Sequence, residues 1–171
     1  MNNTTPIETE VKFLIKIPKI SDLLSQKDIS IKEITQTYLL SSGNSTKRVR
    51  KVSSNGKTRF ILTEKTRISD LSAYENEMEI SFDDYNSFLK NADTSRISIE
   101  KTRYSFPLDS HIVEIDIYPF WNDRAILEIE LSDESEEYSI PSFISVIKNV
   151  SNDTRYKNAS LAKSIVYEDI T

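Results

Sequence analysis

The chain has 171 residues, which is long enough to bury a sizeable core, and we expect residues 1–171 to form a single domain. Its net charge of -5 argues against general nucleic-acid binding, because proteins that bind phosphate backbones usually carry a basic excess. The lack of cysteine excludes disulfides and thiolate metal sites, and the single histidine, His111, excludes a histidine-rich zinc site. Any metal must therefore be bound by carboxylates, which suits Mg²⁺ or Mn²⁺.

Residues 1–6 show no basic stretch followed by an apolar one, and no later segment approaches the roughly 18 apolar residues of a membrane span. We therefore expect a cytoplasmic protein that does not bind membranes. The chain contains only two glycines, too few for the glycine-rich loops that bind nucleotide phosphates. A phosphate site would have to be built from side chains.

The alternation of apolar and polar residues predicts eight strands, at residues 7–16, 31–41, 46–53, 57–66, 75–81, 97–105, 111–118 and 124–131. Asn55 and Gly56 predict a hairpin turn between the third and fourth strands. Helices are predicted at 21–24, from Ser81 and from Pro141, and an amphipathic stretch extends over 159–167. Successive strands are expected to pair antiparallel.

Charged residues occupy alternate positions in these strands. Glu8, Glu10 and Lys12 share one face of the first strand, because side chains two residues apart leave a strand on the same side. Similar sets recur at 48–50, 57–65, 75–79, 101–103, 114–116 and 128–130. Alternation alone fits equally well a half-buried sheet with a solvated outer face.

Two observations favour a barrel with a charged interior. Like charges occur together within a strand, so they repel unless an oppositely charged strand or a ligand compensates them. Eight strands are also enough to close a barrel around side chains or one small ligand. We predict an α+β fold, a closed eight-stranded antiparallel β-barrel that forms a tunnel, with helices packed outside.

Such an interior has two chemical halves. Its basic side chains could hold phosphate oxygens: Arg48, Arg50, Lys65, Lys101 and Arg103. Its acidic side chains could hold a divalent cation: Glu8, Glu10, Glu128 and Glu130. Together they predict metal-assisted phosphoryl transfer to water.

The pattern resembles the CYTH domains of the triphosphate tunnel metalloenzymes. The family's E-x-E-x-K corresponds to residues 8–12, and its other motifs follow in the family's order: Q-x-Y-L at 36–39, R-x-R at 48–50, T-x-K at 63–65, E-x-E-I at 77–80, I-x-K-x-R at 99–103, the W-E-V-D strand at 113–116, E-I-E-L at 128–131 and D-x-R-Y-x-N-x-x-L at 153–161. The similarity covers nearly the whole chain, and its specificity lies in the series of matches.

This resemblance implies a role for each matching residue. Catalytic residues would be Glu8, Glu10, Lys12 and Lys65. Phosphate would be bound by Lys12, Arg48, Arg50, Lys65, Lys101, Arg103 and Arg155, and Mg²⁺ or Mn²⁺ by Glu8, Glu10, Asp116, Glu128 and Glu130. Secondary tunnel acids would be Glu77, Glu79 and Glu114.

The implied function is metal-dependent hydrolysis of a small-molecule triphosphate. Inorganic triphosphate is the first expectation, because no residues clearly supply an adenine or thiamine pocket. The alternatives are a class IV-type adenylyl cyclase, a nucleoside or thiamine triphosphatase, and a non-catalytic sensor that binds polyphosphate or a nucleotide. Thr66 and Ala73 stand where the family usually has glycine and arginine, so these positions bear on the choice of substrate.

Overall fold

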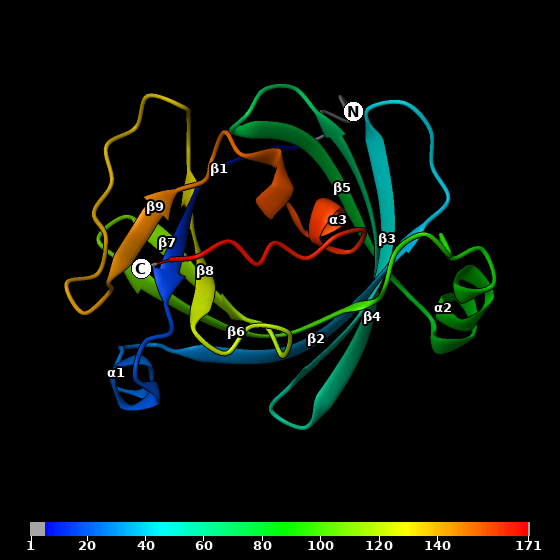
Figure 1. Ribbon diagram of the computed structural model, residues 1–171. Helices are drawn as coiled ribbons and strands as arrows, with labels where there is room; N and C mark the ends of the chain where they lie inside the picture. The colour runs from blue at the N-terminus through cyan, green and yellow to red at the C-terminus, as the bar shows by residue number, and fades with distance from the viewer. Residues whose placement is uncertain (1–5, 171) are drawn as a thin grey trace.

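Eight antiparallel strands close into a barrel in the computed structural model, which describes residues 6–170 (Figure 1). They are β1 (Ile7–Lys16), β2 (Ser30–Leu39), β3 (Ser45–Ser54), β4 (Lys57–Arg67), β5 (Ser72–Ile80), β6 (Ile99–Leu108), β7 (His111–Ile117) and β8 (Arg124–Leu131). The order around the barrel is β5-β4-β3-β2-β6-β7-β8-β1, and a β1–β5 pairing closes it. The predicted closed barrel is thus confirmed.

Strand β1 joins three parts of the sheet. It pairs with β8 from Thr9 to Lys16, while its other edge is divided between two partners. Residues 7–9 pair with β5 and so close the barrel, and residues 13–15 pair with a ninth strand, β9 (Val146–Asn149). The closing contact therefore lies beside Glu8, whose partner in the register is Ala73.

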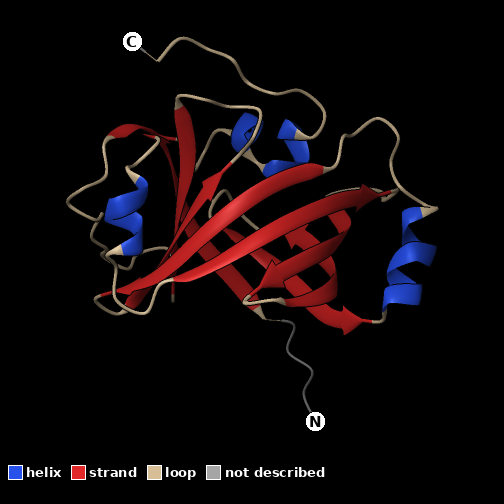
Figure 2. Cartoon of the chain, turned by 90° about the horizontal axis from the view of Figure 1, so that it is seen from below, coloured by secondary structure: helices blue, strands red, loops and turns tan. Residues whose placement is uncertain are grey.

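The outward face of the barrel is apolar and is covered by separate segments. Outward residues of β1, β6, β7 and β8 form a core with Leu23 of α1 (Ile20–Leu24) and with apolar residues of the irregular segment 132–145. Outward residues of β3 and β4 pack against α2 (Phe82–Leu89). Helices α1 and α2 lie on opposite sides of the barrel (Figure 2).

One end of the interior is filled by apolar side chains. Leu14 follows Lys12 by two residues, and Ile99 precedes Lys101 by two, so both point inward like the charged positions. They pack with Tyr156 and Leu161, which come from the 3₁₀ helix η1 (Thr154–Tyr156) and from α3 (Asn158–Leu161). Helix α3 lies in the opening of the barrel in Figure 1. The C-terminal segment thus covers this end of the interior.

Two predicted helices differ from the structure. The helix expected from Pro141 is absent: Ile144 N–H donates to the Pro141 carbonyl in a turn, Phe143 and Ile144 pack on the outward core, and β9 follows. The amphipathic stretch 159–167 is helical only to Leu161, and beyond it Ile165 and Val166 pack in extended chain. None of the helices in residues 6–170 is long and apolar enough to cross a membrane.

Candidate active site

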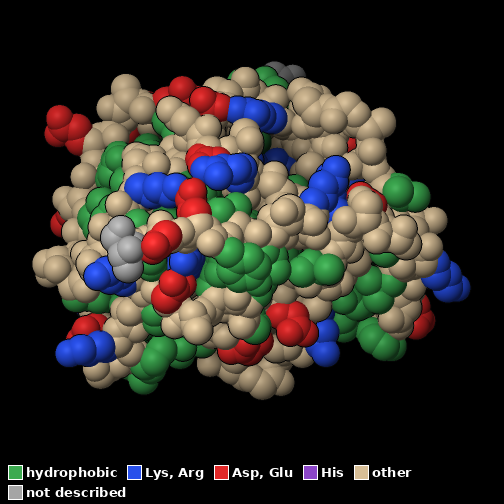
Figure 3. All heavy atoms as spheres, in the orientation of Figure 1, with side chains coloured by type: hydrophobic (Ala, Val, Ile, Leu, Met, Phe, Trp, Pro, Cys, Tyr) green, Lys and Arg blue, Asp and Glu red, His purple; other side chains and the backbone are tan. Residues whose placement is uncertain are grey.

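The barrel encloses a cavity of about 620 Å³ to which every one of β1–β8 contributes side chains. Twelve lysines and arginines and seven glutamates line it, an excess of five positive charges in a chain whose net charge is -5. Figure 3 shows Lys and Arg side chains around a hollow in the face seen in Figure 1. The cavity is therefore an anion-attracting region of an acidic protein.

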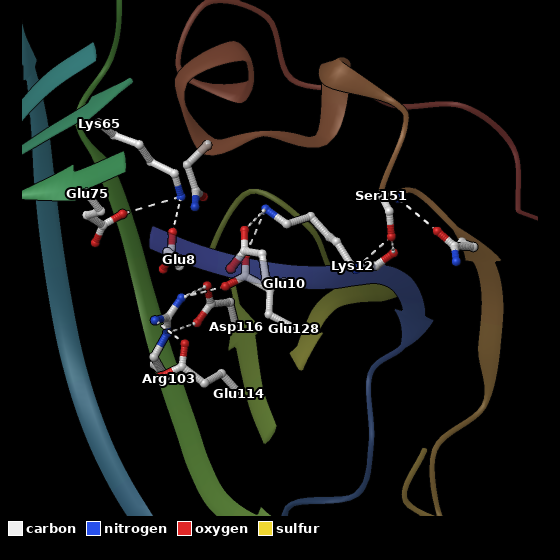
Figure 4. Close-up of polar contacts among 12 residues, drawn as sticks. Glu8, Glu10, Lys12, Lys65, Glu75, Arg103, Glu114, Asp116, Glu128 and Ser151 are labelled. Atoms are coloured by element: carbon white, nitrogen blue, oxygen red, sulfur yellow. Dashed lines mark hydrogen bonds and ion pairs between the residues drawn. The ribbon is translucent and has the colours of Figure 1, made fainter. Parts of the chain in front are cut away.

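Strands β1 and β8 contribute most of the acids. Glu10 lies directly opposite Glu130 and Lys12 lies opposite Glu128. The Lys12 Nζ is 2.8 Å from Glu128 Oε1 and 3.6 Å from Glu10 Oε1. Figure 4 shows Glu8, Glu10 and Lys12 projecting from one side of β1. The facing pair of Glu10 and Glu130 places two negative charges side by side.

Burial and these neighbours shift the pKa values of the acids in opposite directions. Burial and the charge of Glu128 raise the pKa of Glu10, and burial with Glu8 and Glu10 raises that of Glu130. Burial also acts to raise the pKa of Glu128, but Lys12 and Arg103 outweigh it and hold that pKa well below its usual range. Glu128 is thus a stably charged partner of two cations, whereas Glu10 and Glu130 lack sufficient positive charge nearby.

Strands β6 and β7 contribute a buried ion-pair network. Asp116 Oδ2 accepts from Lys101 Nζ at 2.6 Å and from Arg103 Nη2 at 2.7 Å, and Asp116 Oδ1 accepts from Arg103 Nε at 2.6 Å. Arg103 also contacts Glu114 and lies 3.1 Å from Glu128 (Figure 4). The two cations outweigh burial and lower the pKa of Asp116, while burial and Arg103 lower the pKa of Lys101 to about 8.

Glu114 has the least favourable position in this network. Its pKa is raised to about 7, mainly by burial and also by the charges of Glu128, Asp116 and Glu130. These effects together outweigh the lowering effect of Arg103. Glu114 faces Glu128 directly across β7 and β8. A carboxyl group in this position is easily protonated near neutral pH.

Two arginines of β3 that line the cavity carry buried donors without an acceptor in residues 6–170. The Nε atoms of Arg48 and Arg50 are buried and without a hydrogen-bond partner among the described residues. Burial and the charge of Arg48 lower the pKa of Arg50 to about 10 even though Glu77 contacts it. Buried donors are normally satisfied, so these two are suited to an anion that enters the cavity.

Lys65 of β4 lies at the edge of the acidic half. It contacts Glu8, and its Nζ is 3.3 Å from Glu75 Oε2 (Figure 4). Burial acts to lower its pKa, but Glu10 and Glu8 outweigh burial and raise it. Lys65 therefore stays protonated between the acidic β1 and the basic β3.

The carboxylates fit a hard divalent cation by their chemistry. No three His, Cys, Asp or Glu side chains within residues 6–170 lie close enough together to form a metal cage, since Lys12 and Lys65 separate the acids. Glu130, however, has no ion pair with any described residue, and it faces Glu10. Two oxygen-donor groups with raised pKa values and too little compensating charge provide the ligands that Mg²⁺ and Mn²⁺ prefer.

Comparison with known proteins identifies the family. A model of the CYTH domain matches residues 6–163. The chain belongs to the CYTH domain family. No curated protein matches it.

Solved structures share the CYTH fold of this chain. The inorganic triphosphatase NE1496 is 24% identical, with 92% of this chain and 95% of that chain covered and a TM-score of 0.58. PH1819 from Pyrococcus horikoshii OT3 is 19% identical, with 75% and 80% covered and a TM-score of 0.60. A conserved hypothetical protein from Pyrococcus furiosus is 22% identical, with 75% and 80% covered and a TM-score of 0.59.

The CYTH barrel brings most of the predicted site residues into one cavity. Its lining includes Glu8, Glu10, Lys12, Arg48, Arg50, Lys65, Glu77, Lys101, Arg103, Glu114, Glu128 and Glu130. Asp116 lies behind the lining, fully engaged by Lys101 and Arg103. Sequence spacing placed these residues on inward faces, and closure of the sheet brought the faces together.

Two predicted residues lie elsewhere. Arg155 is more than half exposed, bonds Asp153 and Glu168, and lies over the Tyr156 ring. The cavity lining does not include it, because η1 turns its side chain outward. Glu79 pairs with the exposed Arg59 near the end of β5 and is also outside the lining.

Several lining residues were missed by the sequence analysis. Arg67 continues the inward alternation of β4, so the period-two pattern could have identified it, whereas Arg59 and Glu75 belonged to the alternating sets but were assigned no role. Lys157 and Lys163 belong to the segment that crosses the barrel opening. No periodic signal within that segment places its side chains in a cavity formed by distant strands.

Proposed function

We propose that this CYTH protein hydrolyses a triphosphate in the barrel cavity with Mg²⁺ or Mn²⁺ as cofactor, and that inorganic triphosphate is the first substrate to test. The observation that carries the proposal is the convergence of both charge types on one cavity, with unpaired arginine donors on one wall and the facing Glu10 and Glu130 on another. The name of the similar structure NE1496, an inorganic triphosphatase, supports the same choice.

The basic wall would bind and orient the substrate. Arg48 and Arg50 each carry a buried Nε donor that could donate to a phosphate oxygen. Arg103 would add its positive charge, because its nitrogens already contact Asp116, Glu114 and Glu128. Lys101 adds a charge deeper in the barrel. Asp116 is better explained as the residue that positions Lys101 and Arg103 than as a metal ligand, because both of its oxygens are used.

The acidic wall would hold the cofactor and receive the proton of water. Glu10 and Glu130 are the first candidates for ligands, with Glu8 and Glu128 beside them. A bound divalent ion supplies charge neutralisation on phosphate oxygens and polarisation of water. A carboxylate of this wall that the ion leaves free would be placed to accept the proton of that water.

Lys12 and Lys65 would stabilise the charge that develops on the leaving phosphate. Each stands between two carboxylates, Lys12 between Glu10 and Glu128 and Lys65 between Glu8 and Glu75. Their protonated state is favoured by these neighbours, so they remain cationic when substrate enters. Fixed cations in a cavity that excludes bulk water stabilise transition-state charge effectively.

Release of phosphate tests this proposal. Wild-type protein is incubated with inorganic triphosphate, ATP or thiamine triphosphate, each with Mg²⁺, Mn²⁺ or a chelator, and phosphate is measured. We expect release from at least one substrate that needs the ion and is lost in Glu10→Gln. Glu64→Gln, at an exposed glutamate of β4 that does not line the cavity, is the control and should retain the wild-type rate.

The same assay separates the alternatives. A cyclic nucleotide formed from ATP would replace the hydrolase proposal with an adenylyl cyclase. Tight binding of a triphosphate without any turnover, in wild type as in Glu10→Gln, would instead indicate a sensor. Turnover that is unaffected by chelator and by Glu10→Gln would contradict the assigned acidic wall.

A further inference from the structure

Lys157 is a cation of the cavity without an acidic partner. Its side chain lines the cavity and is half-buried, but it makes no ion pair or side-chain hydrogen bond with any residue from 6 to 170. Lys12 and Lys65, in contrast, each contact two carboxylates. Lys157 is therefore available to a ligand in a way that these lysines are not.

The segment around Lys157 is held in place on both sides. Tyr156 before it is buried, and Asn158 after it accepts from the Tyr118 hydroxyl at 2.7 Å. The Lys157 carbonyl accepts from Ser160 and Leu161 at the start of α3, and Leu161 is fully buried. The backbone at Lys157 is thus fixed, which directs a long and flexible side chain toward the barrel opening.

The electrostatic surroundings of Lys157 are positive. Burial and the charges of Arg67, Lys12 and Lys65 lower its pKa, and the charge of Glu10 acts against them with a smaller effect. This cluster differs from the inner one, where Arg50 interacts chiefly with Arg48, Glu77 and Arg103. Lys12, Lys65 and Arg67 are each paired with carboxylates, so Lys157 is the member of this group whose charge is left for an anion to compensate.

We propose that Lys157 is a substrate-contacting residue, which binds the phosphoryl group nearest the α3 end of the cavity and makes the site favour a triphosphate over a diphosphate. This inference rests on the proposed function and adds a residue and a chain-length preference to it. The inner cluster of Arg48, Arg50 and Arg103 is expected to hold one end of the phosphate chain. A diphosphate held there would leave Lys157 without a contact, whereas a third phosphoryl group reaches it.

The test compares Lys157→Met, which removes the charge at similar length, with Lys157→Arg, which retains a charge. Lys51→Met is the matched control, because Lys51 neighbours Arg50 on β3 but is exposed and faces outward. Affinity is measured by calorimetry for inorganic triphosphate and pyrophosphate with Mg²⁺, and KM and kcat for triphosphate are measured in parallel. Thermal unfolding without ligand reports any structural effect.

Loss of a charge-assisted contact predicts that Lys157→Met weakens triphosphate binding by about 10- to 100-fold and raises KM accordingly. Pyrophosphate affinity should change much less. Lys157→Arg should restore most of the triphosphate affinity, and Lys51→Met should equal wild type. Ligand-free Lys157→Met should unfold at the wild-type temperature or above it, since a repelling charge has been removed.

Each other outcome has a distinct meaning. Wild-type affinity and KM in Lys157→Met overturn the inference and leave the proposed function intact. A lower ligand-free melting temperature together with equal losses for both phosphates, not restored by arginine, assigns Lys157 a structural role and also overturns it. If wild type neither binds nor hydrolyses triphosphate, the proposed function itself fails.

Discussion

Asp116 stabilises two buried cations at once. Its side chain is almost fully buried, and its two oxygens accept from Lys101 and Arg103 at 2.6 Å each. Since the cost of burying these charges is offset by their mutual contacts, removing the shared anion leaves Lys101 without its ion pair and Arg103 with only Glu114 and Glu128. Asp116 therefore connects the stability of the barrel to the position of two residues that we propose bind phosphate.

We predict that Asp116→Asn lowers the free energy of unfolding by about 3–5 kcal/mol, the cost of breaking a buried pair from one side. Urea unfolding of the ligand-free protein measures it. Glu79→Gln is the comparison, because its partner Arg59 is 61% exposed and an exposed ion pair contributes little to stability. Equal losses in the two variants would contradict the assigned difference in burial.

At the scale of residues, the two-residue period of a strand predicted which side chains share one face. A spacing of two places Glu8, Glu10 and Lys12 on one face, and that face is the cavity wall. Arg155 was predicted from a family motif, but its outward direction depends on the 3₁₀ turn of η1 and on contacts to Asp153 and Glu168. Those contacts join segments that no local pattern relates.

Among the elements, α1 is held to the barrel by a single buried side chain. The helix has only five residues and no side-chain hydrogen bond at its N-cap. Leu23 is fully buried in the outward core, while Leu24 beside it is 52% exposed. A helix this short is unstable alone, so packing of Leu23 determines its position.

We predict that Leu23→Ala lowers the free energy of unfolding by about 2–5 kcal/mol, because it removes buried contacts and leaves a cavity. Leu24→Ala should cost less than about 1 kcal/mol, since its side chain is half in solvent and alanine favours the helix. Chemical denaturation of both variants measures the difference. A Leu24→Ala loss as large as that of Leu23→Ala would contradict the described packing.

Strands were easier to predict than the segments that cover them. Every barrel strand lies within three residues of its predicted range at both ends, because alternation is written into each strand. Phe143, Ile144 and Ile147 have a spacing that also fits a helix, and a short apolar run does not distinguish the two. Residues 146–149 form β9 instead, because the edge of β1 at residues 13–15 offers hydrogen bonds to them, and Phe143 and Ile144 lie in the turn before this strand.

For the whole molecule, charge is segregated between surface and interior. The cavity lining carries five more positive than negative charges, so the rest of this acidic chain carries the negative excess. A triphosphate is repelled at long range by the net charge and attracted at short range by the lining. The balance depends on ionic strength, because salt screens exposed charges more than buried ones.

We predict that raising ionic strength from about 0.05 M to about 0.5 M changes KM for triphosphate by less than tenfold, since the contacts that bind it lie inside the barrel. Initial rates at fixed free Mg²⁺ measure it, with an inert salt that does not compete for the site. Loss of affinity by several powers of ten would show that exposed charges, and not the buried arginines, supply the binding energy.

The pH dependence of stability is governed by opposing groups in one network. Glu114, Glu10 and Glu130 have raised pKa values, so the folded protein binds protons more tightly than the unfolded chain does. Asp116 and Glu128 have lowered pKa values, and the stability they contribute is lost only as pH falls through those low values. Between pH 4.5, the usual pKa of a glutamate, and about 7, the carboxyl groups with raised pKa values therefore determine how stability changes with pH.

We predict that the metal-free protein loses stability as pH rises from about 5 to about 7, below the pH at which Lys101, with its lowered pKa of about 8, begins to act in the opposite direction. Between the usual pKa of 4.5 and the folded value of about 7, Glu114 is protonated in the folded protein and ionised in the unfolded chain, so each rise in pH favours unfolding. Its contribution is at most about 3 to 4 kcal/mol, from about 1.4 kcal/mol for each unit of pKa difference between 4.5 and about 7. Urea unfolding across this range, in chelator, should show a decline in wild type that is smaller in Glu114→Gln, which leaves Arg103 paired with Asp116 and Glu128. A wild-type profile that is flat or rises, or an identical decline in Glu114→Gln, would contradict the assignment of this carboxyl group as the one under electrostatic strain.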